Sequence, residues 1–133
     1  MKNRILLDSF AVLAWIQDEP GAERVEALLL EARHTESPLL LTALNLGEVY
    51  YRIARQHGHP TAGGIVLQLH ALPIQICPCD ESLALAAARI KADFPLAYAD
   101  AIAAAAAQRE RATVVTGDPE FRKIEHRVPI EWL

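Results

Sequence analysis

The sequence predicts an α/β fold in which helices cover both faces of a mostly parallel sheet. Short apolar segments of strand length alternate with longer segments that have helical spacing. The short segments are apolar throughout, as expected of strands buried on both faces. With 133 residues, 52% of them hydrophobic, and no repeat or linker, the chain is expected to form one domain over residues 1–133.

Strands are expected at the short apolar runs, most of which end at a polar residue, Gly or Pro. Four runs are well marked, and the last run in the chain is a fifth candidate. In order they are RILLD (4–8), PLLLT (38–42), PIQICP (73–78), ATVVTG (112–117) and VPIEWL (128–133).

Helices are expected where apolar residues recur at helical spacing, with Gly and Pro at their ends. DEPG (18–21) separates the first two, Gly58 ends the third, Pro95 separates the last two, and Asp80 is a candidate N-cap. In order they are SFAVLAWI (9–16), AERVEALLLEAR (22–33), ALNLGEVYYRIARQHG (43–58), PTAGGIVLQLHAL (60–72), DESLALAAARIKADF (80–94) and LAYADAIAAAAAQRER (96–111).

The composition restricts the function classes. A net charge of −4 argues against a strongly basic nucleic-acid coat, although metal-binding acids make a nuclease look acidic as well. Cys77 and Cys79 are too close for a disulfide framework and too few for a zinc site. The opening MKNRILLDSF does not read as a signal peptide, and no apolar stretch reaches membrane-spanning length. A cytoplasmic protein without a membrane partner is expected.

Four acids interrupt apolar sequence, and each has a structural alternative to weigh. They are Asp8, Glu48, Asp100 and Asp118. Asp8 could serve only as an N-cap, Glu48 could pair with Arg52 one helical turn on, and Asp118 could be a turn acid. Asp100 has the weakest alternative, because Asp has poor propensity in an alanine-rich helix and no cation stands nearby in sequence.

Together, the four acids indicate a metal site. Asp8 and Asp118 both follow predicted strands, and parallel α/β sheets gather functional groups at the carboxyl ends of their strands. Converging carboxylates repel and raise one another's pKa unless a cation neutralises them, and oxygen ligands suit Mg²⁺ or Mn²⁺. Acid clusters of this kind activate water and stabilise the leaving oxygen in phosphodiester cleavage.

The ordered set of motifs resembles the PIN-domain nucleases, and the compact length is similar to that of VapC-type toxins. Asp8 after the first strand, NLGEVYYR, LAYADAIAAAAA and VVTGDPEF match the four PIN motifs in order across essentially the whole chain. The resemblance implies a three-layer α/β/α sandwich with a mostly parallel sheet of four to five strands. It also implies Mg²⁺- or Mn²⁺-dependent endoribonuclease activity on RNA, a homodimer and a cognate antitoxin protein.

The resemblance also assigns roles to individual residues. Asp8, Glu48, Asp100 and Asp118 match the metal-site acids of the family. Thr116 matches a supporting hydroxyl, expected to hold the Asp118 carboxylate or a metal-bound water, and Ser9 matches a small polar position. Gly117 is expected to permit a sharp turn. The alanine-rich helix is expected to offer a surface to another chain.

Substrate contacts are less strongly marked than the acids. A phosphate-holding rim could come from Arg52, Arg55, Arg122 and Lys123, and base stacking from Tyr50, Tyr51 and Tyr98. Ordinary surface cations, and core or dimer packing of the tyrosines, are the alternatives. Asp93, an extra acid near the third motif, is expected to be a solvated helix-end residue.

Two other functions remain as alternatives. A Mg²⁺-dependent phosphatase or phosphotransfer domain has a similar architecture, but residues 8–10 read DSF and lack the second acid that such a phosphatase usually carries after its first strand. A non-catalytic PIN-like binding module would keep the fold and lose some of the acids, whereas all four are present here.

Overall fold

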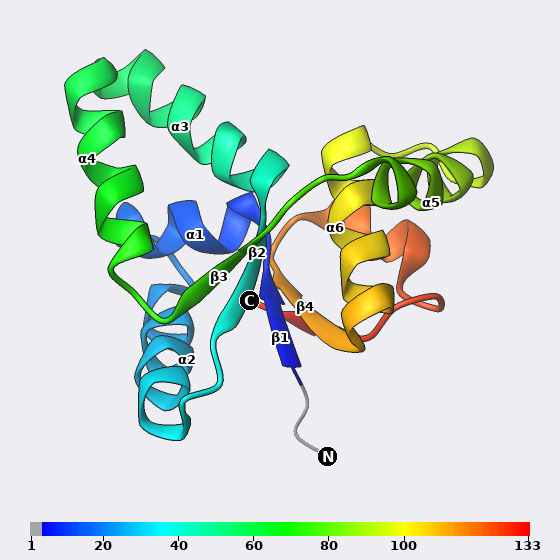
Figure 1. Ribbon diagram of the computed structural model, residues 1–133, viewed down its shortest axis with the longest axis horizontal. Helices are drawn as coiled ribbons and strands as arrows, with labels where there is room; N and C mark the ends of the chain where they lie inside the picture. Colours follow the sequence, from blue (N-terminus) through cyan, green and yellow to red (C-terminus); the bar gives the residue numbers. More distant parts are fainter. Residues whose placement is uncertain (1–3) are drawn as a thin grey trace.

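Five parallel strands form the central sheet of the computed structural model, which describes residues 4–133 (Figure 1). The strands lie in the order β3-β2-β1-β4-β5, so the first strand is at the centre. In the register, Leu6 of β1 pairs with Leu40 on one side and Val114 on the other. The strands are β1 (Arg4–Leu7), β2 (Leu39–Thr42), β3 (Ile74–Cys77), β4 (Ala112–Thr116) and β5 (Ile130–Trp132).

Helices connect these strands, and every helix and strand expected from the sequence is present. The α-helices are α1 (Ser9–Ile16), α2 (Ala22–Thr35), α3 (Ala43–His57), α4 (His59–His70), α5 (Glu81–Asp93) and α6 (Tyr98–Glu110). A short 3-10 helix, η1 (Pro119–Ile124), follows β4. The Asp80 side chain accepts a hydrogen bond from the Leu83 amide at 2.8 Å, so its predicted capping role is confirmed.

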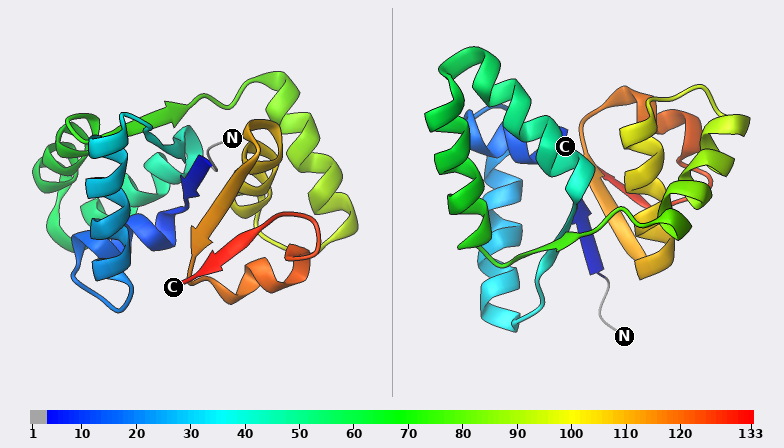
Figure 2. Two further views of the ribbon diagram at one scale, coloured as in Figure 1. Left: turned by 90° about the horizontal axis from the view of Figure 1, so that it is seen from below. Right: turned by 45° about the horizontal axis from the view of Figure 1, so that its top comes forward.

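The helices form a layer on each face of the sheet, as Figures 1 and 2 show: α1 to α4 cover one face, and α5, α6 and η1 cover the other. Each face of the sheet packs against its helices in a separate hydrophobic core, and successive residues of a strand point into alternate cores. Leu6 packs with the α5–α6 side, whereas Leu7 packs with the α1–α4 side. This alternation is the period of a strand with both faces buried. The predicted three-layer α/β/α sandwich is confirmed, and the sheet is wholly parallel.

The alanine-rich helix α6 lies in the core of this chain, so the expectation that it offers a surface to another chain was wrong. The side chains from Ala101 to Ala107 are all buried, none more than 3% exposed. A helix that is apolar all round is buried on all sides, and small side chains let it pack closely against both the sheet and α5. Asp100 lies in the first turn of this buried helix.

The connections change face between the central strand β1 and its neighbour β4. The chain leaves β1 through α1 and α2 on one face, and it reaches β4 from α6 on the other. In parallel α/β sheets, ligands bind beyond the carboxyl ends of the strands at such a switch point. The residues that follow these two strands are Asp8 and Gly117.

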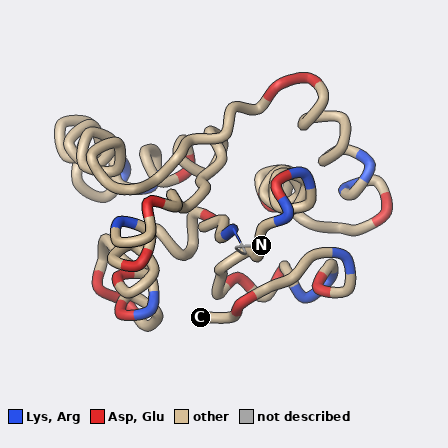
Figure 3. The backbone as a smooth tube through the Cα atoms, turned by 60° about the horizontal axis from the view of Figure 1, so that its bottom comes forward, with Lys and Arg blue, Asp and Glu red and all other residues tan. Residues whose placement is uncertain are grey.

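Charged residues are spread along the chain. Figure 3 shows Lys and Arg interspersed with Asp and Glu along the tube, without a continuous basic stretch in the described part. Among the described residues, no helix combines the length and the apolar character needed to cross a membrane.

Candidate active site

Asp8 is buried where β1 ends and α1 begins, with 1% of its surface exposed. Its Oδ1 accepts a hydrogen bond from the Ala11 amide at 2.9 Å, so Asp8 is the N-cap of α1. Its Oδ2 accepts one from the Thr116 hydroxyl. The pKa of Asp8 is raised to about 7, mainly by burial and in smaller part by the charges of Asp118 and Glu48, while the two hydrogen bonds act in the opposite direction. Asp8 therefore does cap α1, but capping requires neither the second hydrogen bond from Thr116 nor such deep burial. The alternative that Asp8 serves only as an N-cap does not account for these two features.

Thr116, the last residue of β4, links Asp8 to the backbone of Asp118. Its fully buried hydroxyl donates to Asp8 and accepts from the Asp118 amide at 2.9 Å. The expectation that Thr116 bonds the Asp118 carboxylate was therefore wrong. The Asp118 Oδ1 instead accepts from the Glu120 amide at 3.0 Å and caps η1. Thr116 positions two acids, one through its side chain and the other through its backbone.

Gly117 is required for packing, and the expected need for a special turn conformation was wrong. Its backbone lies outside the left-handed region. A Cβ built on Gly117 would stand 2.3 Å from Cε1 of the Phe10 ring, far inside contact distance. A glycine at this position thus lets the Phe10 ring lie against the end of β4.

Glu48 projects from α3, whose first turn Thr42 caps by accepting a hydrogen bond from the Asn45 amide at 3.1 Å. The Glu48 Oε1 accepts from Asn45 Nδ2 at 2.8 Å and from Ser9 Oγ at 3.1 Å. The alternative pairing with Arg52 does not occur, because no ion pair within residues 4–133 includes Glu48. The partner of Ser9 shows why a small polar residue follows Asp8.

Asp100 lies in the first turn of α6 and is only 7% exposed. An acid is favourable at this end of a helix, because the helix dipole places partial positive charge there. The sequence argument from poor propensity inside a helix was therefore wrong for this position. Burial is nevertheless the main effect and raises the pKa of Asp100 to about 7, with further contributions from Asp118, Asp8, Glu48 and Glu120.

Three of the four predicted acids line one pocket, with a volume of about 210 Å³, and Asp8 lies buried beside it. Glu48, Asp100 and Asp118 line this acidic pocket together with Ser9, Phe10, Leu13, Arg52, Ala97 and Glu120. None of the four predicted acids has an ion-pair partner in the described chain. Unneutralised carboxylates from β1, α3, α6 and the β4 end thus gather at the switch point of the sheet.

The acidic pocket suits a divalent cation in ligand type. Within residues 4–133, no three His, Cys, Asp or Glu side chains stand close enough together to enclose a metal ion. Mg²⁺ does not need such a cage, since it keeps several waters and commonly binds through one or two carboxylates plus substrate phosphates. The donors present are carboxylates, and the buried Asn45 Oδ1 beside them has no hydrogen-bond partner in the described residues. The residues therefore fit Mg²⁺ or Mn²⁺ by their chemistry.

Of the four cations predicted to hold phosphate, Arg52 is the one that lines the acidic pocket. The Arg55 guanidinium lies 4.8 Å from the centre of the Tyr51 ring, and that of Arg122 lies 5.8 Å from the Trp132 ring. Lys123 pairs with Glu120 at 2.6 Å. These three already have partners, so Arg52 is best placed to meet an anionic substrate.

The aromatic residue at the acidic pocket is Phe10, which the sequence reasoning missed. Tyr50 bonds His59 at 2.8 Å, the Tyr98 hydroxyl donates to the Ala84 carbonyl at 2.8 Å, and neither lines the acidic pocket. Phe10 is 40% exposed and does line it. The sequence feature that could have identified Phe10 is its position, two residues after the predicted site residue Asp8.

Two further acids complete the account of the site. Glu120 lines the acidic pocket and was also missed; it stands two residues after Asp118, inside the VVTGDPEF motif. Asp93, the last residue of α5, is exposed, as expected of a solvated helix end.

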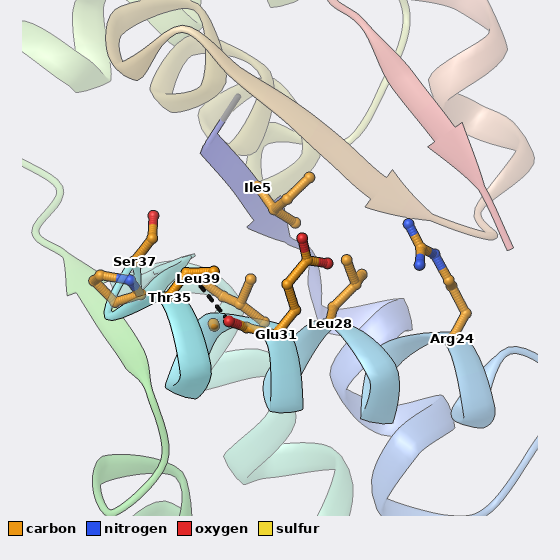
Figure 4. Close-up of a pocket in the computed structure, with 9 residues that line it drawn as sticks. Ile5, Arg24, Leu28, Glu31, Thr35, Ser37 and Leu39 are labelled. Carbon is orange, nitrogen blue, oxygen red and sulfur yellow. Dashed lines mark hydrogen bonds between the residues drawn. The ribbon is translucent and has the colours of Figure 1, made fainter. Parts of the chain in front are cut away.

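A separate cavity of about 390 Å³ lies at the opposite end of the strands, between α2 and the beginnings of β1 and β2 (Figure 4). Its lining includes apolar Ile5, Leu28 and Leu39 beside one acid, Glu31. Its one cation, Arg24, already pairs with Glu131 at 2.6 Å. The groups that could do chemistry are in the acidic pocket instead.

The fold and the site together define a class of protein: a parallel α/β domain with an acidic pocket at the switch point of its sheet. A family model described as PIN domain matches residues 5–127. The match spans nearly all of the 133 residues, and the chain belongs to the PIN-domain family. The resemblance predicted from the four motifs is confirmed. No curated protein matches the chain in sequence.

Solved structures of similar fold include toxin–antitoxin proteins. The DNA-bound VapBC from Salmonella typhimurium is 19% identical, with a TM-score of 0.77 and 98% of each chain covered. FitAcB from Neisseria gonorrhoeae is 26% identical, with a TM-score of 0.70 and 95% of each chain covered. VapC20 from Mycobacterium tuberculosis, a toxin that cleaves the sarcin–ricin loop, is 14% identical, with a TM-score of 0.68 and 89% of this chain and 92% of that one covered.

Proposed function

We propose that this chain is a Mg²⁺- or Mn²⁺-dependent endoribonuclease that hydrolyses RNA phosphodiester bonds, and that it is the toxin of a toxin–antitoxin pair. The observation that carries this proposal is the acidic pocket, where Glu48, Asp100 and Asp118 meet beside buried Asp8 without ion-pair partners. Membership of the PIN-domain family and the fold shared with a toxin that cleaves the sarcin–ricin loop support the choice of RNA.

In this mechanism, the site formed by Asp8, Glu48, Asp100 and Asp118 would hold a divalent cation, with one or two carboxylates as direct ligands and the others acting through its waters. A bound cation would stabilise negative charge on the phosphate oxygens and lower the pKa of a neighbouring water. Thr116 and the caps of α1, α3 and η1 fix the carboxylates before substrate arrives. Such rigidity matters because catalytic groups must keep their positions to within fractions of an ångström.

Individual residues have separate tasks in this mechanism. Ser9 and Asn45 orient the Glu48 carboxylate through its Oε1 atom. Arg52, exposed at the rim of the acidic pocket, holds a substrate phosphate by charge-assisted hydrogen bonds. The pocket carboxylates repel the phosphates of RNA. A bound divalent cation and the unpaired Arg52 guanidinium would together offset this repulsion, so that an acidic protein could bind an anionic substrate.

The proposed partners are RNA, a cognate antitoxin protein and a second copy of this chain. Toxin–antitoxin complexes among the proteins of similar fold support the antitoxin. An antitoxin could block the acidic pocket by offering an Arg, since a guanidinium fork suits carboxylates. A chain that is strictly monomeric by light scattering, and whose neighbouring small open reading frame does not neutralise toxicity, would contradict these partners.

The test of activity is single-turnover cleavage of a 5′-labelled single-stranded RNA with Mn²⁺, Mg²⁺ or EDTA. We expect metal-dependent fragments from the wild-type protein and none from Asp100→Asn. A generic phosphate ester measured in parallel separates the alternatives: a phosphatase would hydrolyse the ester and leave RNA intact, and a non-catalytic module would do neither.

A further inference from the structure

A groove between α1 and α3 leads away from the acidic pocket. A second hollow, with a volume of about 420 Å³, shares Phe10, Leu13 and Arg52 with the acidic pocket. Beyond them it is lined by Gln17 near the end of α1 and Gln56 near the end of α3. The volume lies within the roughly 300–1,000 Å³ of typical ligand pockets. We call this second hollow the α1–α3 groove.

The groove has a regular origin in the sequence. Glu48, Arg52 and Gln56 recur every four residues and so form one stripe of α3, while Phe10, Leu13 and Gln17 form the facing stripe of α1. From Glu48 to Gln56 the helix rises by about 12 Å. Stacked nucleotides are spaced by roughly 3.4 Å along a strand, so this length accommodates a nucleotide beyond the one at the acidic pocket.

Phe10 gives this groove an aromatic surface. Its ring is 40% exposed, although α1 buries Ala11 to Ala14 next to it. One edge of the ring fills the space that the missing Cβ of Gly117 leaves. The ring thus packs against the end of β4 on one side and is open on the other. An exposed ring of this kind is suited to stacking on a base, a contact that all four bases can make.

The charges along the groove change from acidic to balanced. The acidic pocket carries Glu48, Asp100, Asp118 and Glu120, whereas Glu19 is the acid among the described residues that line the α1–α3 groove. Arg52 stands where the two hollows join and has no ion-pair partner within residues 4–133. An anionic strand can therefore leave the acidic pocket past a free guanidinium.

At the far end of the groove, two amide side chains bond each other. Gln17 Nε2 donates to Gln56 Oε1 at 2.8 Å. Each amide has one donor nitrogen and one acceptor oxygen, so this bond leaves Gln17 Oε1 and Gln56 Nε2 without a partner in the described chain. An acceptor beside a donor is the pattern that bonds the edge of an unstacked base.

We propose that the α1–α3 groove binds the nucleotide that flanks the scissile phosphate, and that it sets base preference on one side of the cut. Phe10 stacks on the base, Arg52 holds the intervening phosphate, and the Gln17–Gln56 pair contacts the base edge. This inference rests on the proposed endoribonuclease function and names the substrate-binding surface for that same site.

Two measurements test it on the intact protein. The first is single-turnover cleavage of a randomised single-stranded RNA in Mn²⁺, with sequencing of the ends. The second is fluorescence-anisotropy binding of a labelled short RNA in EDTA, which does not require cleavage. The variants are Phe10→Leu, Phe10→Tyr and the double variant Gln17→Ala/Gln56→Ala. Matched controls outside both hollows are Leu67→Ala, where the side chain is 74% exposed, and Gln68→Ala, both on α4.

Phe10→Leu should raise two quantities about tenfold: the RNA concentration that gives the half-maximal cleavage rate, and the Kd for RNA in EDTA. The cleavage rate at saturating RNA should change less than about threefold. Phe10→Tyr keeps the ring and should behave as wild type. The double Gln variant should lose base preference at one position beside the cut. Both controls should leave every value unchanged.

The outcomes separate this inference from the proposed function. If wild type cleaves RNA but Phe10→Leu and the double Gln variant keep its half-saturation, Kd and base preference, the groove assignment is wrong and the endoribonuclease stands. RNA that binds, loses affinity in Phe10→Leu and is never cleaved would support the groove and contradict the endoribonuclease. A protein that neither binds nor cleaves RNA overturns both.

Discussion

Thr116 and Asp8 are 108 positions apart in sequence, yet the Thr116 hydroxyl donates a hydrogen bond to Asp8 Oδ2 in the interior of the protein. The Thr116 hydroxyl oxygen in turn accepts a hydrogen bond from the Asp118 amide at 2.9 Å. One hydroxyl thus joins the ends of β1 and β4 and sets the positions of two proposed metal-site acids. We therefore expect Thr116 to act as a positioning residue, and its replacement to change both stability and the proposed activity.

Thr116→Val keeps the shape of the side chain and removes both hydrogen bonds. The buried Asp8 Oδ2 then lacks its donor and the Asp118 amide lacks its acceptor, which should cost about 1–3 kcal/mol of unfolding free energy. Cleavage should fall about tenfold as the two acids lose their fixed positions, a barrier change of about 1.4 kcal/mol. Urea unfolding and single-turnover cleavage measure the two effects. Thr116→Ser, which keeps the hydroxyl, is the control; a valine variant equal to wild type in both assays would contradict this role.

Gly117→Ala should destabilise the protein through Phe10. The added Cβ would stand 2.3 Å from Cε1 of the Phe10 ring, so the ring must shift. Because this side chain is 40% exposed, we expect a cost of about 1 kcal/mol, the low end of the range for overpacking. In a Phe10→Ala background the space is open, so the same Gly117→Ala change should cost much less. A double-mutant cycle of urea unfolding measures this coupling. Equal costs in the two backgrounds would show that Gly117 is needed for some other reason.

The difference between the Asp80 cap and the Gly117 contact shows how far sequence reasoning reaches. Asp80 is recognisable because its partner, the Leu83 amide, stands three residues away and the signal is local. The strands and helices follow from periodicity in the same way. The ring beside Gly117 comes from residue 10, in the helix that follows the neighbouring strand β1, and no local pattern encodes that approach. The sequence thus marked a special position but assigned it the wrong cause.

The same distinction applies inside the site. Asp8 and Asp118 were predicted to meet because strand ends of a parallel sheet meet, which is a topological argument. Glu48 and Asp100 lie on helices and were added because they interrupt apolar sequence and match the family motifs. The hydrogen-bond partners of the four acids could not be derived, since they depend on side-chain directions across elements. The Thr116 hydroxyl was therefore assigned to the neighbouring acid in sequence, whereas its acceptor belongs to β1.

Without metal, the folded protein should lose stability as the pH rises through about 7. Asp8 and Asp100 have pKa values raised to about 7 in the folded state, above the ordinary value of about 4. A carboxyl group whose pKa is higher in the folded than in the unfolded protein adds to the free energy of unfolding. This contribution is complete at a pH below the unfolded-state pKa, and it is lost as the pH rises through the folded-state pKa. The melting temperature in EDTA should drop by a few degrees between pH 5 and pH 8. Asp100→Asn, with one of the two groups removed, should show a smaller drop, and an equal drop would contradict the assignment.

Addition of Mn²⁺ should reverse this trend. The cation binds ionised carboxylates, so it competes with protons and stabilises the folded state by mass action. At a fixed Mn²⁺ concentration, the rise in melting temperature over the EDTA value should be larger at pH 8 than at pH 6. Asp8→Asn and Asp100→Asn should both reduce that rise at pH 8. If both variants keep the wild-type rise, the cation binds elsewhere on the protein.

Asp118→Asn should separate catalysis from folding. The asparagine Oδ1 can still accept from the Glu120 amide, so the cap of η1 is retained while one negative charge is lost. Because Asp118 raises the pKa of both Asp8 and Asp100, this loss relieves repulsion, and the metal-free protein should be as stable as wild type or slightly more so. Single-turnover RNA cleavage at saturating Mn²⁺ should nevertheless fall by roughly two powers of ten, about 3 kcal/mol of transition-state stabilisation.

Glu120→Gln tests the neighbouring carboxylate, which pairs with Lys123 at 2.6 Å, and should give a much smaller loss. Circular dichroism confirms the fold of both variants; a folded Asp118→Asn protein that cleaves at the wild-type rate would leave Asp118 with its capping role alone.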